Sequence, residues 1–455
     1  MKLIKDIFKV FNSNMLMLIS NTIITVLLPL TLSVEGYGEY RQYILYISYI
    51  GICHLGYIDG IYIKYGGKNL NENKELLRKE HSFLVKFQFV ITIVLVTIAI
   101  VLKDIVLFLL SISIIPVNIS SFYKMLYQST GLFSKYSRIN ILFTIINLLS
   151  ICFLLIFGIN SSYYYIGATL FAYLCLLISL EINFLKVAKG IEKQKDFKYG
   201  NYFKVGIFIL LGNFSIQLIN NLGLWIVNIF FEIKDFSHFS FATSMLNMVL
   251  IAVSAVGLTF YNYLAKKEDP KIVILAKKLL IILGVSGGAI YFVLELFINK
   301  FIPTYSLSLK IISIAFLNLP YLMIINVIII NLYKARKQEK KFFRVILFIF
   351  LISLIIHLAS YLIFKSLVPI AMATTLTYII WYTFSVNKDF KYLKSSGGEI
   401  ILLTIYLLSF YLCANYLNWL YGGLIYLAIN SITIFVCYRA DLRVLFDKVS
   451  NKSAA

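Results

Sequence analysis

The chain has too few charged residues for a soluble protein of its size. Asp, Glu, Lys and Arg make up 14% of its 455 residues, whereas an ordinary globular domain has about a quarter. Acidic residues are especially scarce, with 21 Asp and Glu against 42 Lys and Arg, and 60% of all residues are hydrophobic. This composition excludes a water-exposed globular fold and favours helices that face lipid.

Cysteine and the known catalytic motifs are also nearly absent. The five cysteines lie in apolar stretches without the spacing of metal ligands, so we interpret them as small hydrophobic side chains. No zinc motif, Walker loop or nucleophile elbow occurs. We therefore expect no cofactor, no metal site and no ATP hydrolysis, so any transport must use an ion gradient or the gradient of the substrate.

No Pro/Gly/Ser-rich linker or long polar tract separates soluble domains. Instead, the chain contains about fourteen apolar stretches, each near the ~20 residues that a helix needs to cross a bilayer. The predicted spans are 11–32, 41–63, 83–102, 105–123, 139–159, 164–185, 205–231, 237–263, 279–299, 308–332, 345–364, 368–386, 399–417 and 421–438. The sequence thus predicts an all-α, polytopic membrane protein with about 14 transmembrane helices.

The basic residues predict how these spans are oriented. With the N-terminus inside, 35 of the 42 Lys and Arg residues fall in alternate polar segments and only six fall in the others. Because Lys and Arg are retained on the cytoplasmic side of short loops, both termini are predicted to be cytoplasmic. The positive charge lies beside hydrophobic spans, where it contacts anionic headgroups of membrane lipids, so no nucleic-acid partner is expected.

The predicted outer loops are too short to hold an active site. Each is at most about ten residues long, whereas a polytopic glycosyltransferase or polysaccharide polymerase usually carries its catalytic groups on a long external loop. We therefore do not expect an enzyme or any catalytic residue. A membrane-embedded enzyme of polysaccharide assembly remains the least favoured alternative.

One predicted span carries a stripe of amide side chains. At 100° per residue, five amides of the span 205–231 fall within an arc of about 100°. They are Asn213, Gln217, Asn220, Asn221 and Asn228. Polar residues in spanning helices either line a cavity or form interhelical hydrogen bonds. Because five amides exceed what interhelical bonding requires, we favour the wall of a substrate cavity.

A weaker stripe in the first span suggests an internal duplication. Asn14, Asn21 and Thr25 lie on one face of that span. An ungapped match of Asn21 to Asn220 also aligns the outer turns that follow, although chance similarity between aromatic-rich turns is a competing explanation. Internal symmetry is common in secondary transporters. It predicts an N-terminal lobe at 1–200, a pseudo-symmetric C-terminal lobe at 201–390, each of six helices, and a last helix pair with a basic tail at 391–455.

Three titratable residues within the spans are candidates for ion coupling. His54 and Asp59 lie in the second span, and Glu295 lies in the ninth. Lys86 enters the third span at a depth similar to that of Asp59. Two interpretations stay open, since Asp59 and His54 can carry protons or a cation, or Asp59 can simply pair with Lys86.

The N-terminal third resembles a known family. The resemblance rests on Pro29, Gly36-Tyr37-Gly38-Glu39-Tyr40, Gly56-Tyr57-Ile58-Asp59-Gly60-Ile61 and Tyr65-Gly66-Gly67-Lys68. These motifs resemble the opening of Wzx-type O-antigen and capsule-repeat flippases, the polysaccharide transporters of the multidrug/oligosaccharidyl-lipid/polysaccharide exporter superfamily. The resemblance implies a flippase of the bacterial plasma membrane that moves an undecaprenyl-diphosphate-linked oligosaccharide from the inner to the outer leaflet by alternating access.

The resemblance also assigns roles to residues and partners. The amides would bind sugar hydroxyls, and Arg41, Lys86 and Lys310 are the candidates for contact with the diphosphate, although each could be an interface anchor. The expected partners are the lipid-linked oligosaccharide and membrane lipids. Other membrane proteins of polysaccharide assembly are further candidate partners. A multidrug/cation antiporter of the same superfamily is the alternative function.

Overall fold

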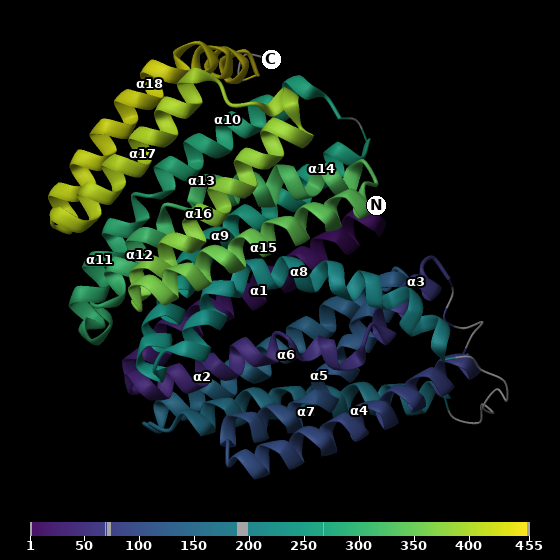
Figure 1. Cartoon of the computed structure of the whole chain (residues 1–455). Coiled ribbons are helices and arrows are strands. Elements are labelled where there is room, and N and C mark those ends of the chain that lie inside the picture. Colours follow the sequence, from purple (N-terminus) through teal and green to yellow (C-terminus); the bar gives the residue numbers. More distant parts are fainter. Residues whose placement is uncertain (1, 69, 71–73, 189–198, 267, 453–455) are drawn as a thin grey trace. The chain divides into compact units, whose positions relative to one another are not determined.

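The computed structural model describes residues 2–68, 70, 74–188, 199–266 and 268–452, and these residues form helices and connections without any strand (Figure 1). The chain divides into two compact units, Met1–Gln217 (unit 1) and Leu218–Ala455 (unit 2). The division falls inside helix α8 (Gly200–Phe230).

Unit 1 contains seven α-helices, one short 3₁₀ helix and the first part of α8 among its described residues. They are α1 (Lys2–Thr31), α2 (Val34–Ile47), the 3₁₀ helix η1 (Ile50–His54), α3 (Tyr57–Tyr65), α4 (Lys74–Leu102), α5 (Ile105–Ser129), α6 (Phe133–Ile156) and α7 (Ser162–Ala188). Within this unit α1 packs against α6, α4 against α5, and α7 against both α5 and α6.

Unit 2 contains the rest of α8 and the remaining helices. Its elements are α9 (Ile233–Lys266), α10 (Pro270–Gly287), α11 (Ile290–Phe301), η3 (Pro303–Tyr305), α12 (Ser308–Phe316), α13 (Leu319–Ile324), the π-helix η4 (Ile325–Ile329), α14 (Ile330–Ala335), α15 (Glu339–Phe364), α16 (Leu367–Phe384), the π-helix η5 (Ser385–Asp389), η6 (Lys391–Leu393), α17 (Gly397–Tyr416) and α18 (Trp419–Lys452). Within this unit α17 packs against α18, α15 against α16, and α9 against α12.

The described helices confirm the all-α membrane architecture. Eleven of them are long and apolar enough to cross a bilayer, and the number is thirteen if each of two bent helix pairs is one span. The predicted span at 237–263 lies in α9, a further helix of 34 residues. Each of the fourteen predicted spans therefore coincides with a helix or with consecutive helices. Large apolar side chains such as Ile156 and Val436 are mostly exposed on them, as expected for helices that face lipid.

Two spans are broken by sharp bends. In unit 1 the segments Val34–His54 and Tyr57–Tyr65 meet at 66°, and in unit 2 the segments Ser308–Phe316 and Leu319–Ala335 meet at 50°. The second break precedes Pro320, which has no N–H to continue the helical hydrogen bonds. The first break passes through Leu55 and Gly56, whose φ angles of 48° and 82° are left-handed.

The helix pair α1–α2 and the helix pair α8–α9 share one sequence register. Helix α1 ends at Thr31 and α2 begins at Val34, whereas α8 ends at Phe230 and α9 begins at Ile233. The end of α8 therefore lies as many residues after the end of α1 as the start of α9 lies after the start of α2. The same spacing separates Asn21 from Asn220. The aligned residues are buried alike as well, since Tyr37 and Phe236 are both almost fully enclosed.

Candidate functional site

The bend between η1 and α3 creates a buried polar site in unit 1. The bend is possible because glycines let α3 approach α8 closely: a side chain on Gly60 would collide with the backbone of Tyr202, and one on Gly206 would collide with Gly56. The Gly-Tyr-Ile-Asp-Gly string thus has a packing role, and it positions His54 and Asp59 on the two sides of the break.

His54 and Asp59 lie next to each other in this site. The backbone N–H of Gly56 donates to His54 Nδ1 at 3.2 Å, and the same nitrogen lies 3.8 Å from Asp59 Oδ2. Because Nδ1 accepts the bond from Gly56, it carries no proton for Asp59, so the two side chains do not form an ion pair. Asp59 is 3% exposed, and its Oδ2 has no hydrogen-bond partner among the described residues.

A buried carboxylate oxygen without a donor is costly in a membrane helix. Charged groups at such positions are expected to bind a proton or a cation, or to face a polar path. Asp59 lies in the first turn of α3, where the helix dipole favours negative charge. Lys86, the alternative partner, is exposed. The described residues therefore show no pairing of Asp59 with Lys86.

Two amide side chains complete the site by donating hydrogen bonds to backbone carbonyl groups of η1. Gln88 Nε2 donates to Cys53 O at 3.1 Å, and Asn118 Nδ2 donates to Gln88 Oε1 at 2.7 Å and to Ile50 O at 3.3 Å. The amide pair ties α4 and α5 to the broken turn. Gln88 is absent from the sequence-predicted site, although an amide inside an apolar span was a signal for it.

A second buried carboxylate in unit 1 is fully bonded. Glu80 is completely enclosed in α4, where Lys64 and Tyr65 donate to it at 2.8 Å each and Tyr202 donates as well. Sequence reasoning missed this cluster because Glu80 lies in a hinge rich in charged residues. Since its oxygens are satisfied, Glu80 holds α3, α4 and α8 together rather than offering a site.

The predicted cavity amides make several hydrogen bonds within their own units. Asn14 accepts from Asn140 at 3.1 Å, Gln217 donates to Ser48 O at 2.8 Å and Asn220 accepts from Tyr378 at 3.2 Å. These bonds link α1 to α6, α8 to the end of α2, and α8 to α16. The remaining predicted amides and threonine are placed as follows: Asn21 and Asn213 are exposed, and Thr25, Asn221 and Asn228 are half-buried.

The basic and acidic candidates do not converge within either unit. Arg41 is half-buried in α2, Lys86 is exposed in α4, and Lys310 is exposed in α12. Glu295 is half-buried in α11, and its Oε2 has no hydrogen-bond partner among the described residues. No group of three or more metal-ligating side chains occurs in the part of the chain that the structure describes.

Unit 2 has its own buried polar network around a histidine. His357 lies in the apolar span of α15, where it is 1% exposed and its Nε2 lies 3.0 Å from Thr374 Oγ1. Its Nδ1 lies 2.8 Å from Ser353 O, and Thr377 donates to Ser353 Oγ at 3.0 Å. This network links α15 to α16, and sequence reasoning overlooked it although a histidine in an apolar span is unusual.

Comparison with known proteins gives a match in structure only. No protein-family model matches the chain, and no curated protein does. Among solved structures, the lipid II flippase MurJ in its inward closed conformation has a TM-score of 0.67, at 16% identity, over 96% of this chain and 99% of that chain. The chain has a MurJ-like fold.

This likeness confirms a polytopic membrane fold of the kind found in a flippase. A further solved structure, MATE in complex with Br-NRF, has a TM-score of 0.41 at 9% identity, over 88% of this chain and 96% of that chain. That second score is too low to support any argument. No sequence-family match supports the Wzx-type resemblance.

Proposed function

We propose that this protein is a flippase that moves an undecaprenyl-diphosphate-linked oligosaccharide from the inner to the outer leaflet of a bacterial plasma membrane by alternating access. The observation that carries this proposal is the MurJ-like fold over nearly the whole chain. MurJ is a lipid II flippase, so the same architecture handles a lipid-linked substrate in that protein. Both termini would be cytoplasmic, as the distribution of basic residues predicts.

The exposed and half-buried amides support a sugar-binding role. Asn213, Asn220 and Asn221 retain hydrogen-bonding capacity on α8, and Asn21 and Thr25 do so on α1. Amides offer both donors and acceptors, which suits the hydroxyl groups of a glycan. The lipid tail would stay in the bilayer, and Arg41, Lys86 or Lys310 would meet the diphosphate.

Asp59 supports coupling to an ion gradient. One oxygen of its carboxylate, Oδ2, has no hydrogen-bond partner among the described residues, and His54 lies beside it. A proton or a cation that enters this site in one conformation and leaves it in another would drive the cycle. Glu295 is the corresponding candidate in unit 2.

The test is a flipping assay in sealed vesicles that contain the purified protein and a fluorescent undecaprenyl-diphosphate oligosaccharide. Asn220→Leu is expected to reduce flipping at least tenfold while the protein stays folded. Tyr378→Phe removes the hydrogen bond that Tyr378 donates to Asn220 but keeps the amide, so this variant should flip normally. Asn299→Leu, which changes an exposed amide of α11, is the matched control.

One outcome would overturn the assignment of Asn220, and two would overturn the flippase proposal itself. Normal flipping by Asn220→Leu would remove this amide from the substrate site. Efflux of cationic drugs without oligosaccharide flipping would favour the antiporter alternative. Turnover of the lipid-linked sugar in detergent would indicate an enzyme, because flipping requires a sealed membrane.

A further inference from the structure

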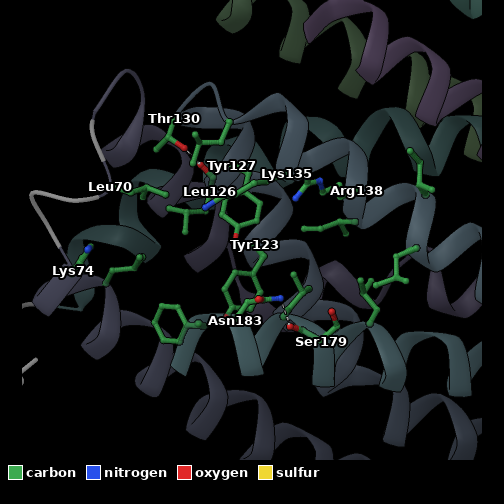
Figure 2. A pocket seen from close by; sticks show the side chains of 18 of the residues that line it. Leu70, Lys74, Tyr123, Leu126, Tyr127, Thr130, Lys135, Arg138, Ser179 and Asn183 are labelled. Carbon is green, nitrogen blue, oxygen red and sulfur yellow. Dashed lines mark hydrogen bonds between the residues drawn. The ribbon is translucent and has the colours of Figure 1, made fainter. Parts of the chain in front are cut away.

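A large pocket opens in unit 1 away from the residues discussed above. It lies among the end of α5, the start of α6, the end of α7 and the start of α4 (Figure 2). Its volume is about 1230 Å³. This exceeds the roughly 300–1,000 Å³ of typical small-molecule sites, so the pocket has room for a ligand larger than a metabolite.

The polar end of the pocket is strongly basic. Lys68, Lys74, Lys135 and Arg138 line it, and among the described residues no Asp or Glu does so. In the part of the chain that the structure describes, none of the four forms an ion pair with a carboxylate. Lys135 lies over the ring of Tyr127 at 5.3 Å. The pocket therefore concentrates positive charge that is not neutralised by these residues.

The two cations of α6 are arranged to meet one ligand group. Lys135 and Arg138 are three residues apart in the first turns of the helix, so they occupy the same face. Figure 2 shows them along one wall of the pocket, with Ser179 and Asn183 of α7 on the opposite wall and Tyr123 between. An ammonium beside a guanidinium fork suits the oxygens of a phosphate.

The nearest carboxylate in α7 is turned to other partners. Glu181 does not line the pocket, and its Oε1 lies 2.7 Å from His81 Nε2 and accepts a bond from Tyr123 at 3.2 Å. This bonding fixes the Tyr123 ring in the pocket wall. The negative charge of Glu181 is thus paired with α4 and α5 rather than with the pocket cations.

The other end of the pocket is apolar and reaches the lipid-facing surface. Leu142, Ile145, Leu176 and Leu180 continue the lining along α6 and α7. Leu142 is 36% and Ile145 44% exposed on a helix long and apolar enough to span the bilayer. The lining changes from cationic to apolar along the direction in which a membrane lipid changes from headgroup to acyl chain.

We infer that this pocket binds an anionic phospholipid of the bilayer, with its phosphate at Lys135 and Arg138 and an acyl chain along Leu142 and Ile145. Basic pockets between transmembrane helices on the cytoplasmic side recognise acidic headgroups, and the charge distribution places this pocket on that side. A free phosphate would leave the apolar half empty. None of Arg41, Lys86 and Lys310 lines the pocket, so the site is distinct from the predicted diphosphate contacts.

The experiment is native mass spectrometry of the full chain titrated with phosphatidylglycerol, phosphatidylcholine, undecaprenyl diphosphate or inorganic phosphate. The wild type should bind phosphatidylglycerol at least tenfold more tightly than phosphatidylcholine. Lys135→Gln with Arg138→Gln should abolish that preference. Lys391→Gln with Lys394→Gln removes the same charge from exposed positions of unit 2 and should keep it.

A second variant tests the apolar half independently of charge. Ile145→Trp places a larger ring on a lipid-facing position, so the protein should fold and still bind phosphatidylglycerol several-fold more weakly. Equal binding of the two phospholipids, or an unchanged preference in the Lys135/Arg138 variant, would refute the inference. Tighter binding of undecaprenyl diphosphate would assign the pocket to the substrate instead, and full competition by inorganic phosphate would assign it to a free anion.

Discussion

A Cβ atom on Gly206 would lie 1.8 Å from the carbonyl oxygen of Gly56. The two glycines bring the broken span of unit 1 into backbone contact with α8. Because the obstructing atom belongs to the backbone, a side chain at position 206 cannot be accommodated by a rotamer change. The bend that carries His54 and Asp59 therefore depends on a residue that is distant in the sequence.

The first prediction is that Gly206→Ala destabilises the protein. The added methyl group must push α8 away from α3, and overpacking of this kind typically costs about 1–3 kcal/mol. Gly212→Ala is the matched control, since a Cβ there has nothing within 4 Å and Ala is the better helix former. Denaturant unfolding in a defined detergent measures both. Equal stability of the two variants would contradict the close approach.

The second prediction concerns Asp59 and rests on the proposed function. Asp59→Asn removes the buried charge at nearly constant volume, so the protein should fold, whereas flipping driven by an imposed ion gradient should fall at least tenfold. Glu75→Gln neutralises an exposed carboxylate of α4 and should flip normally. Gradient-dependent flipping by Asp59→Asn at the wild-type rate would exclude Asp59 as the coupling site.

The fold could be predicted because its main signal is local. A stretch of about twenty apolar residues is visible in the sequence whatever it packs against, and each of the fourteen predicted spans coincides with helical residues. The bends were not predictable in the same way. The break at Leu55 and Gly56 depends on contact with Gly206, and no local pattern records that contact.

Some of the buried polar residues could likewise be predicted from the local sequence, and others could not. His54 and Asp59 stood out because they interrupt an apolar stretch, and the structure brings them together. Glu80 did not stand out, since it lies among the charged residues that precede its span, yet it is completely enclosed. The basic pocket is assembled from three separate stretches of sequence, 67–77, 123–145 and 176–184, so no single stretch could indicate it.

The third prediction concerns a buried ion pair in unit 2. Lys277 Nζ lies 2.6 Å from Glu399 Oε2, both side chains are almost fully buried, and Lys277 also donates to Leu393 O. Glu399→Gln leaves the lysine charge without a counter-charge, and such changes typically cost about 3–5 kcal/mol. Unfolding measurements should show this loss.

The matched variant for that pair combines Glu399→Gln with Lys277→Met. The double variant has no uncompensated charge, so it should recover a large part of the lost stability. Ser396→Ala tests the neighbouring helix cap separately, because Ser396 Oγ accepts from Glu399 N, and it should cost only about 1 kcal/mol. A double variant as unstable as Glu399→Gln would show that the cost does not come from the unpaired lysine.

The fourth prediction is a pH dependence that arises outside the spans of unit 2. Arg336 donates to both oxygens of Glu268, at 2.9 and 2.5 Å, and Tyr392 donates at 2.8 Å. The hydrogen bonds from Arg336 hold the pKa of Glu268 below its ordinary value, although burial opposes them. A lowered folded-state pKa means that the pair stabilises the protein fully above the ordinary pKa of about 4.3.

That stabilisation should disappear as the pH falls through the lowered pKa of Glu268. Because both side chains are partly exposed, the contribution is expected to be at most about 1 kcal/mol. Thermal unfolding of the wild type and of Glu268→Gln between pH 7 and pH 3 measures it: the two midpoints should differ at pH 7 and converge towards pH 3. A difference that stays constant across this range would mean that ionisation of Glu268 does not contribute to folding.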